Sequence, residues 1–91
     1  MFYFNRGAAK QAQGDLNASI ADYDRTLELD PGFAMAYNNR GVIRFILGDS
    51  DRAMNDYNQA IALDPRGADV YRNRWLARYV TEAKRKLAPR R

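Results

Sequence analysis

The chain of 91 residues contains no cysteine and no histidine. Without thiols there is neither a disulfide framework nor a thiol nucleophile, and without imidazoles the usual zinc sites and imidazole acid–base catalysis are excluded. The remaining carboxylates and hydroxyls form no spacing typical of a catalytic or metal-binding site. We therefore expect a protein that is not an enzyme and that has no catalytic residues, no cofactor and no bound metal.

Long apolar runs are missing as well. No run approaches the roughly 20 apolar residues that a membrane helix needs, and the first residues lack the basic region and apolar core of a signal peptide. We expect no membrane partner and a cytoplasmic localisation.

Charge is unevenly distributed along the chain. Residues 1–65 carry 6 basic and 9 acidic side chains, a net charge of −3, and residues 66–91 carry 9 basic and 2 acidic side chains, a net charge of +7, which together give the formal +4. The basic character therefore belongs to the last predicted helix and the tail.

The strongest positive feature is an internal repeat with a period of 34 residues, of which residues 37–65 form one complete copy. A fixed period of this length indicates a helical solenoid, whose units stack because none can bury its apolar face alone. Only Tyr71, Asn73 and Arg74 continue the pattern into a third copy. The identical pairs are Tyr3 and Tyr37, Asn5 and Asn39, Arg6 and Arg40, Gly7 and Gly41, Gly14 and Gly48, Asp15 and Asp49, Asp22 and Asp56, Tyr23 and Tyr57, Leu29 and Leu63, Asp30 and Asp64, and Pro31 and Pro65.

Helical spacing of apolar residues predicts two helices in each copy, separated by the Gly-Asp turn and closed by Asp-Pro. We expect helices over residues 2–13, 16–29, 34–47 and 68–87, besides the second helix of the middle copy. Gly7 and Gly41 should be crossing points where the aromatic ring of Tyr23 or Tyr57 approaches the backbone. Trp75 stands where the third such glycine would recur.

The period, the aromatic followed four residues later by glycine, the Gly-Asp turn and the closing Leu-Asp-Pro resemble the tetratricopeptide repeat (TPR) family, in an Asn-Arg-Gly variant. The resemblance implies an all-α, right-handed α-solenoid with five helices. It divides the chain into a first repeat at 1–33, a second at 34–67, a capping helix at 68–88 and a basic tail at 89–91. Because Tyr3 already lies inside the first helix, we interpret the chain as part of a longer protein or as one with an abrupt start.

Recurring charges have a structural and a functional interpretation. Arg6 and Arg40 could form a row that binds anions, but we favour ion pairs with Asp22 and Asp56, because a half-buried charge persists only when it is paired. Arg74 has no aspartate in its own copy, and Asp56 is the candidate for its partner.

In the TPR family the first helices of successive repeats line a concave groove that holds a peptide, and side-chain amides there can bond to peptide groups of any sequence. Alternatively, these asparagines bond to neighbouring helices. By resemblance, the partner-binding residues are Asn5, Asn38, Asn39, Val42, Phe45, Arg72, Asn73, Leu76 and Tyr79, with Phe4, Ala8 and Gln11 beside them.

One subset of the family binds chaperone C-terminal tails through a clamp of lysine, asparagine and arginine side chains. The corresponding positions hold Phe4, Ala8, Asn39, Asp69 and Asn73, and only Asn39 fits. The sequence therefore predicts that no such clamp is present.

The resemblance favours a protein-interaction module that takes a protein or peptide ligand. One alternative is electrostatic binding of nucleic acid, which would depend on salt. Another is self-association into a homo-oligomer through Phe2, Phe4 and Trp75, which suits a chain near the lower size limit for a self-sufficient core. For Trp75 itself we favour a capping side chain that fills the space left by a missing helix over a self-association contact. The basic side chains of the nucleic-acid alternative are Arg72, Arg74, Arg78, Lys84, Arg85, Lys86, Arg90 and Arg91.

Overall fold

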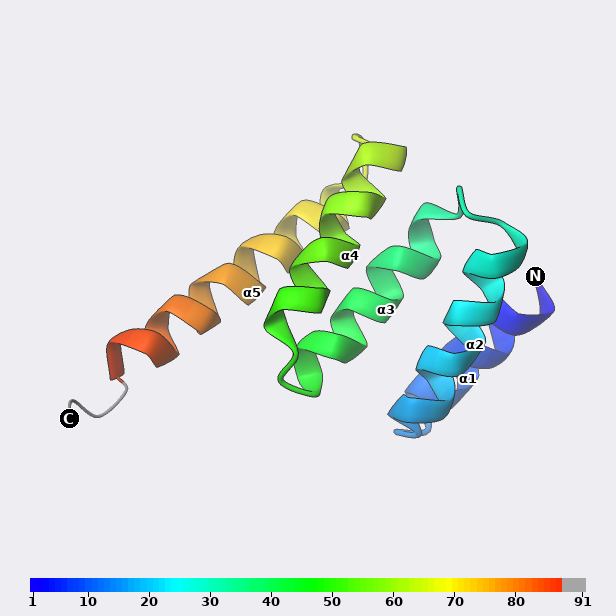
Figure 1. The fold of residues 1–91 in the computed structure, drawn as a ribbon, viewed down its shortest axis with the longest axis horizontal. Coiled ribbons are helices and arrows are strands. Elements are labelled where there is room, and N and C mark those ends of the chain that lie inside the picture. Colours follow the sequence, from blue (N-terminus) through cyan, green and yellow to red (C-terminus); the bar gives the residue numbers. More distant parts are fainter. Residues whose placement is uncertain (88–91) are drawn as a thin grey trace.

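The structure is a computed structural model that describes residues 1–87, so the predicted tail at 89–91 lies outside the described residues. It consists of five helices: α1 (Phe2–Ala12), α2 (Leu16–Leu29), α3 (Ala34–Ile46), α4 (Ser50–Leu63) and α5 (Ala68–Leu87). The described residues contain no strand. The predicted all-α solenoid is confirmed, and the helices stack in chain order along a longest dimension of 48 Å (Figure 1).

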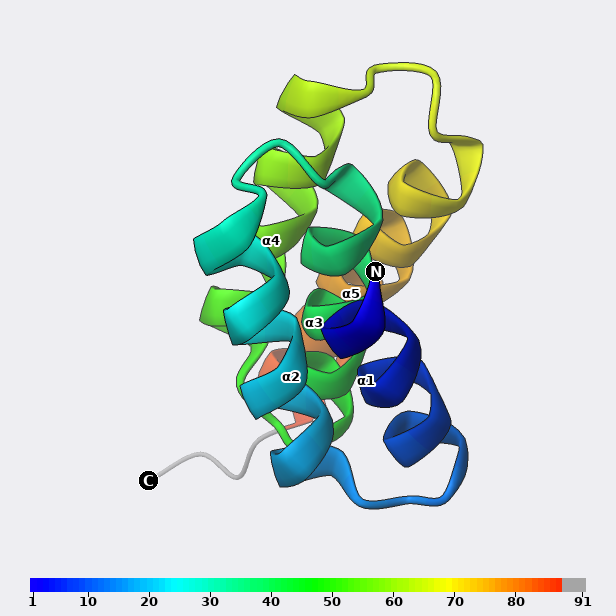
Figure 2. The same cartoon turned by 90° about the vertical axis from the view of Figure 1, so that its right-hand side faces the viewer.

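The helices form two layers. Viewed along the stack, α2 and α4 lie on one side and α1, α3 and α5 on the other (Figure 2). This arrangement follows from antiparallel helix pairs joined by short turns. The layer of α1, α3 and α5 holds all of the predicted partner-binding residues.

Glycine makes the tight turn inside each helix pair. Gly14 and Gly48 have φ angles of +83° and +88°, a region that side chains other than glycine rarely adopt. The aspartate after each glycine occupies the N-cap position of the next helix. The Asp49 side chain accepts a hydrogen bond of 3.3 Å from the backbone N–H of Arg52, whereas Asp15 makes no such bond.

The two helical glycines lie where the helices of each pair cross. A Cβ atom on Gly41 would lie 2.8 Å from Cε1 of Tyr57, and one on Gly7 would lie 2.8 Å from Cε1 of Tyr23. Both tyrosines are almost completely buried. The absence of a side chain at these glycines therefore sets the close approach of the paired helices.

The buried core follows the stack and weakens toward α5. Tyr23, Tyr57 and Ile43 are the largest fully buried apolar side chains. In α5 only Val70 and Ala77 are buried, and they pack on Tyr57 and its neighbours in α4. Most of α5 beyond this contact is open to solvent. None of the described helices combines the length and apolar character needed to cross a membrane.

Candidate functional site

The predicted partner-binding residues differ in their exposure. The exposed members lie on α1 and α5, and those on α3 are half-buried or buried. Asn5, Arg72, Leu76 and Tyr79 are exposed; Asn39, Val42, Phe45 and Asn73 are half-buried; Asn38 is buried.

Asn38 is not available to a ligand, which corrects its prediction as a binding residue. Its side chain is only 5% exposed, and its Oδ1 accepts a hydrogen bond of 3.1 Å from Nδ2 of Asn73. A polar group buried at this depth needs such a partner. Asn38 therefore positions Asn73 by joining α3 to α5.

Asn39 also contacts a neighbouring helix. Its Nδ2 donates a hydrogen bond of 3.4 Å to the hydroxyl of Tyr23, and that hydroxyl donates one of 2.9 Å to Oε1 of Gln11. Burial raises the pKa of Tyr23, so the hydroxyl stays protonated and keeps its donor role. The alternative that these asparagines bond to neighbouring helices thus applies to Asn39 and Asn73.

A hollow of about 340 Å³ lies where α3 meets the second half of α5. Phe45, Ile46 and Val80 give it an apolar wall, and Lys84 supplies a positive charge at its edge. Sequence reasoning assigned Phe45 to the groove but missed Ile46, Val80 and Lys84. Ile46 and Val80 stand 34 residues apart and are both aliphatic, a recurrence that could have identified them.

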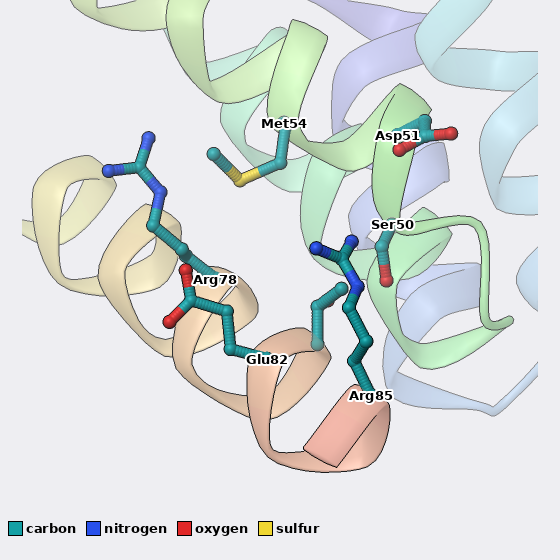
Figure 3. A pocket seen from close by; sticks show the side chains of 7 residues that line it. Ser50, Asp51, Met54, Arg78, Glu82 and Arg85 are labelled. Atoms are coloured by element: carbon teal, nitrogen blue, oxygen red, sulfur yellow. The ribbon is translucent and has the colours of Figure 1, made fainter. Parts of the chain in front are cut away.

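A smaller hollow lies between the start of α4 and the middle of α5 (Figure 3). Its lining mixes Arg78 and Arg85 with the acidic side chains of Asp51 and Glu82, around Met54. Because charges of both signs lie there together, the hollow has no clear preference for an anion or a cation.

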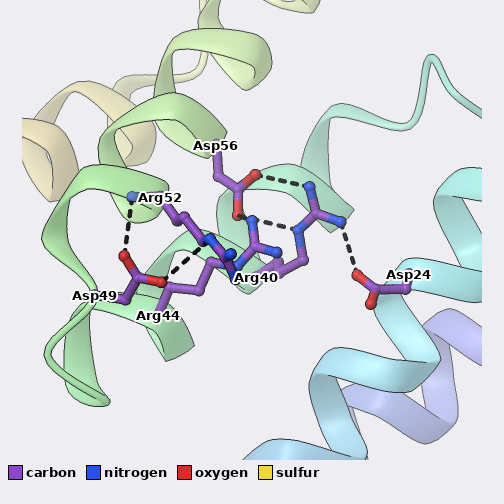
Figure 4. Close-up of polar contacts among 6 residues, drawn as sticks. All are labelled: Asp24, Arg40, Arg44, Asp49, Arg52 and Asp56. Carbon is purple, nitrogen blue, oxygen red and sulfur yellow. Dashed lines mark hydrogen bonds and ion pairs between the residues drawn. The ribbon is translucent and has the colours of Figure 1, made fainter.

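An ion-pair cluster joins α2, α3 and α4 (Figure 4). Arg40 donates from Nε and Nη2 to the two carboxylate oxygens of Asp56, at 3.0 and 2.8 Å, and from Nη1 to Asp24 at 2.8 Å. Arg44 donates to Asp56 at 2.8 Å. The carboxylate of Asp56 is only 3% exposed, so two guanidinium groups compensate one buried negative charge.

The first helix pair contains a similar cluster. Arg6 donates to Asp22 from Nε at 2.9 Å and from Nη2 at 2.7 Å, and the ammonium of Lys10 lies 3.2 Å from the same carboxylate. Hydrogen bonding to Arg6 is the main cause that lowers the pKa of Asp22 from 3.8 to about 2. The aspartate is thus held in its charged form.

The depressed pKa of Asp22 predicts a loss of stability in acid. A carboxyl whose pKa is lower in the folded state stabilises that state above the unfolded pKa, near 3.8, and loses this contribution as the pH falls through about 2. We expect the urea midpoint of the unchanged protein to fall more steeply between pH 4 and pH 2 than that of Asp22→Asn. Parallel pH profiles of the two proteins would contradict the assignment.

Arg74 does not use Asp56, which corrects the partner suggested by the repeat pattern. Its Nη1 donates a hydrogen bond of 2.9 Å to Oδ1 of Asn58. Asn58 stands 34 residues after Asp24, and Arg40 uses its own Nη1 for Asp24. The carboxylate of Asp56 is already occupied by Arg40 and Arg44.

The aromatic side chains at the two ends of the stack behave differently. On α1, Phe4 stacks on Phe33 with ring centroids 4.7 Å apart, while Phe2 is 65% exposed. On α5, Trp75 stacks on Tyr79 at 5.2 Å but remains 63% exposed. Trp75 therefore leaves most of its indole ring open to solvent at the end of the stack.

The basic side chains of α5 are largely exposed, and Arg72 pairs with Asp69 at 3.3 Å. Lys84, Arg85 and Lys86 lie in its last turn, and Arg90 and Arg91 lie outside the described residues. Among residues 1–87, no group of three acidic side chains is placed to hold a metal ion.

Two family models match the chain. Residues 34–66 match the model described as Tetratricopeptide repeat, and residues 7–48 match the one described as TPR repeat. No curated protein matches the chain significantly.

Among solved structures, the chain is similar to the first TPR of Spaghetti (RPAP3) bound to the HSP90 peptide SRMEEVD, with 26% identity and a TM-score of 0.86 over 90% of this chain. It is also similar to MamA, with 26% identity and a TM-score of 0.83 over 92% of this chain. The chain spans 65% of the length of the first of these structures and 48% of the second.

Proposed function

Because the chain carries tetratricopeptide repeats across residues 7–66, we propose that it is a non-enzymatic protein-interaction module. It receives a peptide or helix of a partner protein along the layer formed by α1, α3 and α5. The first repeat at residues 1–33, which starts abruptly, the second at 34–67 and the helix from 68 onward supply this surface together.

The observation that carries the proposal is the apolar hollow between α3 and α5. Its wall of Phe45, Ile46 and Val80 is open to solvent at Ile46, which is 60% exposed. Leu76 and Tyr79 add further exposed apolar surface on α5, at 45% and 59%. Apolar side chains gathered in a concavity favour a partner that buries them.

Polar groups earlier along α3 and α5 can orient a peptide that continues from the hollow. The Nδ2 groups of Asn39 and Asn73 are engaged within the protein, and among the described contacts their Oδ1 atoms accept no hydrogen bond. Each Oδ1 atom can therefore accept a peptide N–H. This arrangement suits an extended or helical segment recognised through its backbone and a few apolar side chains.

The solved RPAP3 repeat binds an HSP90 peptide, but we propose a different ligand for this chain. The clamp positions hold Phe4, Ala8 and Asp69 in place of cationic or amide side chains. Phe4 is engaged in stacking on Phe33. A free peptide carboxylate would thus meet an aromatic ring and an acidic side chain.

The test is a nuclease-treated affinity capture from lysate of the source cells, followed by titration of the partner identified. The binding variant carries Ile46→Ser and Leu76→Ser, because both side chains are exposed, at 60% and 45%, and their replacement should disturb the fold little. The matched control carries Leu29→Ser and Leu63→Ser on α2 and α4, which are 69% and 44% exposed. We expect the binding variant to lose at least about tenfold in affinity and the control to retain it.

Equal affinity of both variants would contradict the proposed groove. If the captured material is lost after nuclease treatment, the result would favour nucleic-acid binding by the basic side chains of α5 instead. The peptide SRMEEVD serves as a further probe, and tight binding that requires its free carboxylate would refute the absence of a clamp.

A further inference from the structure

The outer face of α5 repeats the face of α3 that holds α4. On α3 this face consists of Tyr37, Arg40, Gly41 and Arg44. The glycine contacts the Tyr57 ring, and both arginines bind Asp56. The residues 34 positions later are Tyr71, Arg74, Trp75 and Arg78, which we call the α5 outer face.

No described helix covers the α5 outer face. In Figure 1, α5 lies at the end of the stack with α4 as its neighbour. The same four side chains surround a surface hollow of about 310 Å³. The hollow therefore lies where a helix equivalent to α4 would pack.

Arg74 is held in the same way as Arg40. The guanidinium of Arg40 lies 5.4 Å from the ring centre of Tyr37, and that of Arg74 lies 5.5 Å from the ring centre of Tyr71. Each arginine also anchors Nη1 on a side chain 16 residues earlier, Asp24 or Asn58.

The difference between the two arginines lies at the opposite edge of the guanidinium. In Arg40, Nε and Nη2 form a bidentate contact with Asp56. In Arg74 this edge has no partner among the described residues, and Arg78, the counterpart of Arg44, has no described ion pair. Arg74 is thus oriented with one edge of its guanidinium free, and Arg78 lines the same hollow. Although Glu82 lies near Arg78 in the neighbouring hollow, no described ion pair joins the two, so this pair of cations matches Arg40 and Arg44 without their shared carboxylate.

The same arrangement of ion pairs occurs in the first helix pair, where Arg6 and Lys10 both pair with Asp22. Three helices therefore present a cation pair with a spacing of four residues. In the two described pairs, one nearly buried aspartate of the following helix neutralises the cations.

We propose that the α5 outer face binds a helix of a partner protein that carries an aspartate in the centre of its apolar face. The aspartate contacts Arg74 and Arg78 together, as Asp56 contacts Arg40 and Arg44. This surface shares no lining residue with the hollow between α3 and α5, and it adjoins the proposed groove only where Tyr79 stacks on Trp75. The proposal does not depend on the proposed groove.

Trp75 determines which residue stands beside that aspartate. On α3 the glycine leaves room for Tyr57, which follows Asp56 in α4, and even a Cβ atom would come within 2.8 Å of the ring. With tryptophan at this position, a tyrosine on the partner would collide. The partner helix therefore has glycine or alanine after its aspartate, so that the exposed indole of Trp75 covers the small residue.

Charge argues against a second copy of the chain as the occupant. Two α5 helices packed through this face would bring Arg74 and Arg78 of both copies together, and like charges repel. The two aspartates that make such ion pairs within the chain, Asp22 and Asp56, are buried, so a second copy cannot offer them to Arg74 and Arg78. An acidic partner helix satisfies the arginines without displacing existing pairs.

The experiment uses the full chain and a synthetic peptide with the α4 sequence, residues 50–63, carrying Tyr57→Gly. The peptide also carries Asn55→Lys and Gln59→Asp at two positions that are exposed in α4, and the amine and the carboxyl group are condensed to a lactam. This bridge keeps the peptide helical, because isolated helices of this length are marginal. Trp75 is the one tryptophan of the sequence, so its fluorescence reports directly on this face. We expect saturable binding that weakens at least about tenfold when the peptide also carries Asp56→Asn or when the chain carries Arg78→Ala.

The matched control exchanges the large and the small side chain between position 57 of the peptide and position 75 of the chain. The peptide that keeps Tyr57 should bind the unchanged chain at least about tenfold more weakly, yet bind the Trp75→Gly chain as well as or better than the peptide with Tyr57→Gly does, as measured by calorimetry. The groove variant Ile46→Ser, Leu76→Ser should retain peptide binding. The proposal is overturned by no binding at about 1 mM peptide, by equal affinity of the Asp56→Asn peptide, or by sedimentation showing a chain dimer that depends on Trp75.

Discussion

Asp56→Asn should lower the free energy of unfolding by about 3 kcal/mol, because it removes the negative charge shared by two guanidinium groups. The side chains of Arg40 and Arg44 are only 15% and 18% exposed. Water therefore replaces the lost ion pairs poorly, and the two positive charges are left facing each other. Urea denaturation followed by circular dichroism at pH 7 measures the change.

Asp22→Asn is the internal control for this effect. Asp22 is as deeply buried as Asp56, but its partners Arg6 and Lys10 are 45% and 29% exposed. Solvent can compensate these cations more fully, so we expect a loss of about half that for Asp56→Asn. Equal losses for the two variants, or a loss below about 1 kcal/mol for Asp56→Asn, would show that burial of the cations does not control the energy.

Tyr57→Ala should be the most destabilising single change, at about 4 kcal/mol. The side chain is 1% exposed and fills the space between Gly41 and the buried residues of α5, so truncation leaves a cavity. A chain of this length has a total stability of roughly 5–14 kcal/mol. The measurement therefore uses trimethylamine N-oxide to keep the variant folded.

Gly41→Ala tests the same contact from the other helix. In the unchanged protein the added methyl group meets the Tyr57 ring at 2.8 Å, and we expect a loss of about 1–2 kcal/mol despite the better helix propensity of alanine. In the Tyr57→Ala background the ring is gone and the Cβ atom of Asp56 at 3.2 Å is the close contact that remains, so the same substitution should cost less than about 1 kcal/mol. If Gly41→Ala destabilises the unchanged protein and the Tyr57→Ala variant equally, the added methyl group does not clash with the Tyr57 ring.

The helices could be predicted well because their boundaries depend on local chemistry. The Gly-Asp turns and the Asp-Pro stops repeat in phase, and the predicted bounds of the second and fifth helices, 16–29 and 68–87, agree with α2 and α5. The ion pairs between Arg6 and Asp22 and between Arg40 and Asp56 are also present. Their residues recur at the same spacing, so one geometry serves both copies.

The fate of individual polar side chains could not be predicted, because it depends on helices that are distant in sequence. Asn38 is buried and bonded to Asn73 across 35 positions, and helical periodicity within α3 gives no sign of that contact. Arg74 bonds to Asn58, the counterpart of Asp24, and not to Asp56, whose carboxylate already binds Arg40 and Arg44. Competition among several cations for one carboxylate becomes visible only when all of them are placed in space.

Arg40 contacts aspartates of two successive helix pairs, Asp24 on α2 and Asp56 on α4. Separation of α1 and α2 from the stack would therefore cost more than the apolar contact between the pairs, since it would also remove a charge-assisted bond from the guanidinium that neutralises Asp56. In a linear stack, such a term couples nearest neighbours and raises the cooperativity of unfolding. The contact between Arg40 and Asp24 therefore strengthens the coupling between the two helix pairs and makes partial opening from the N-terminal end less favourable.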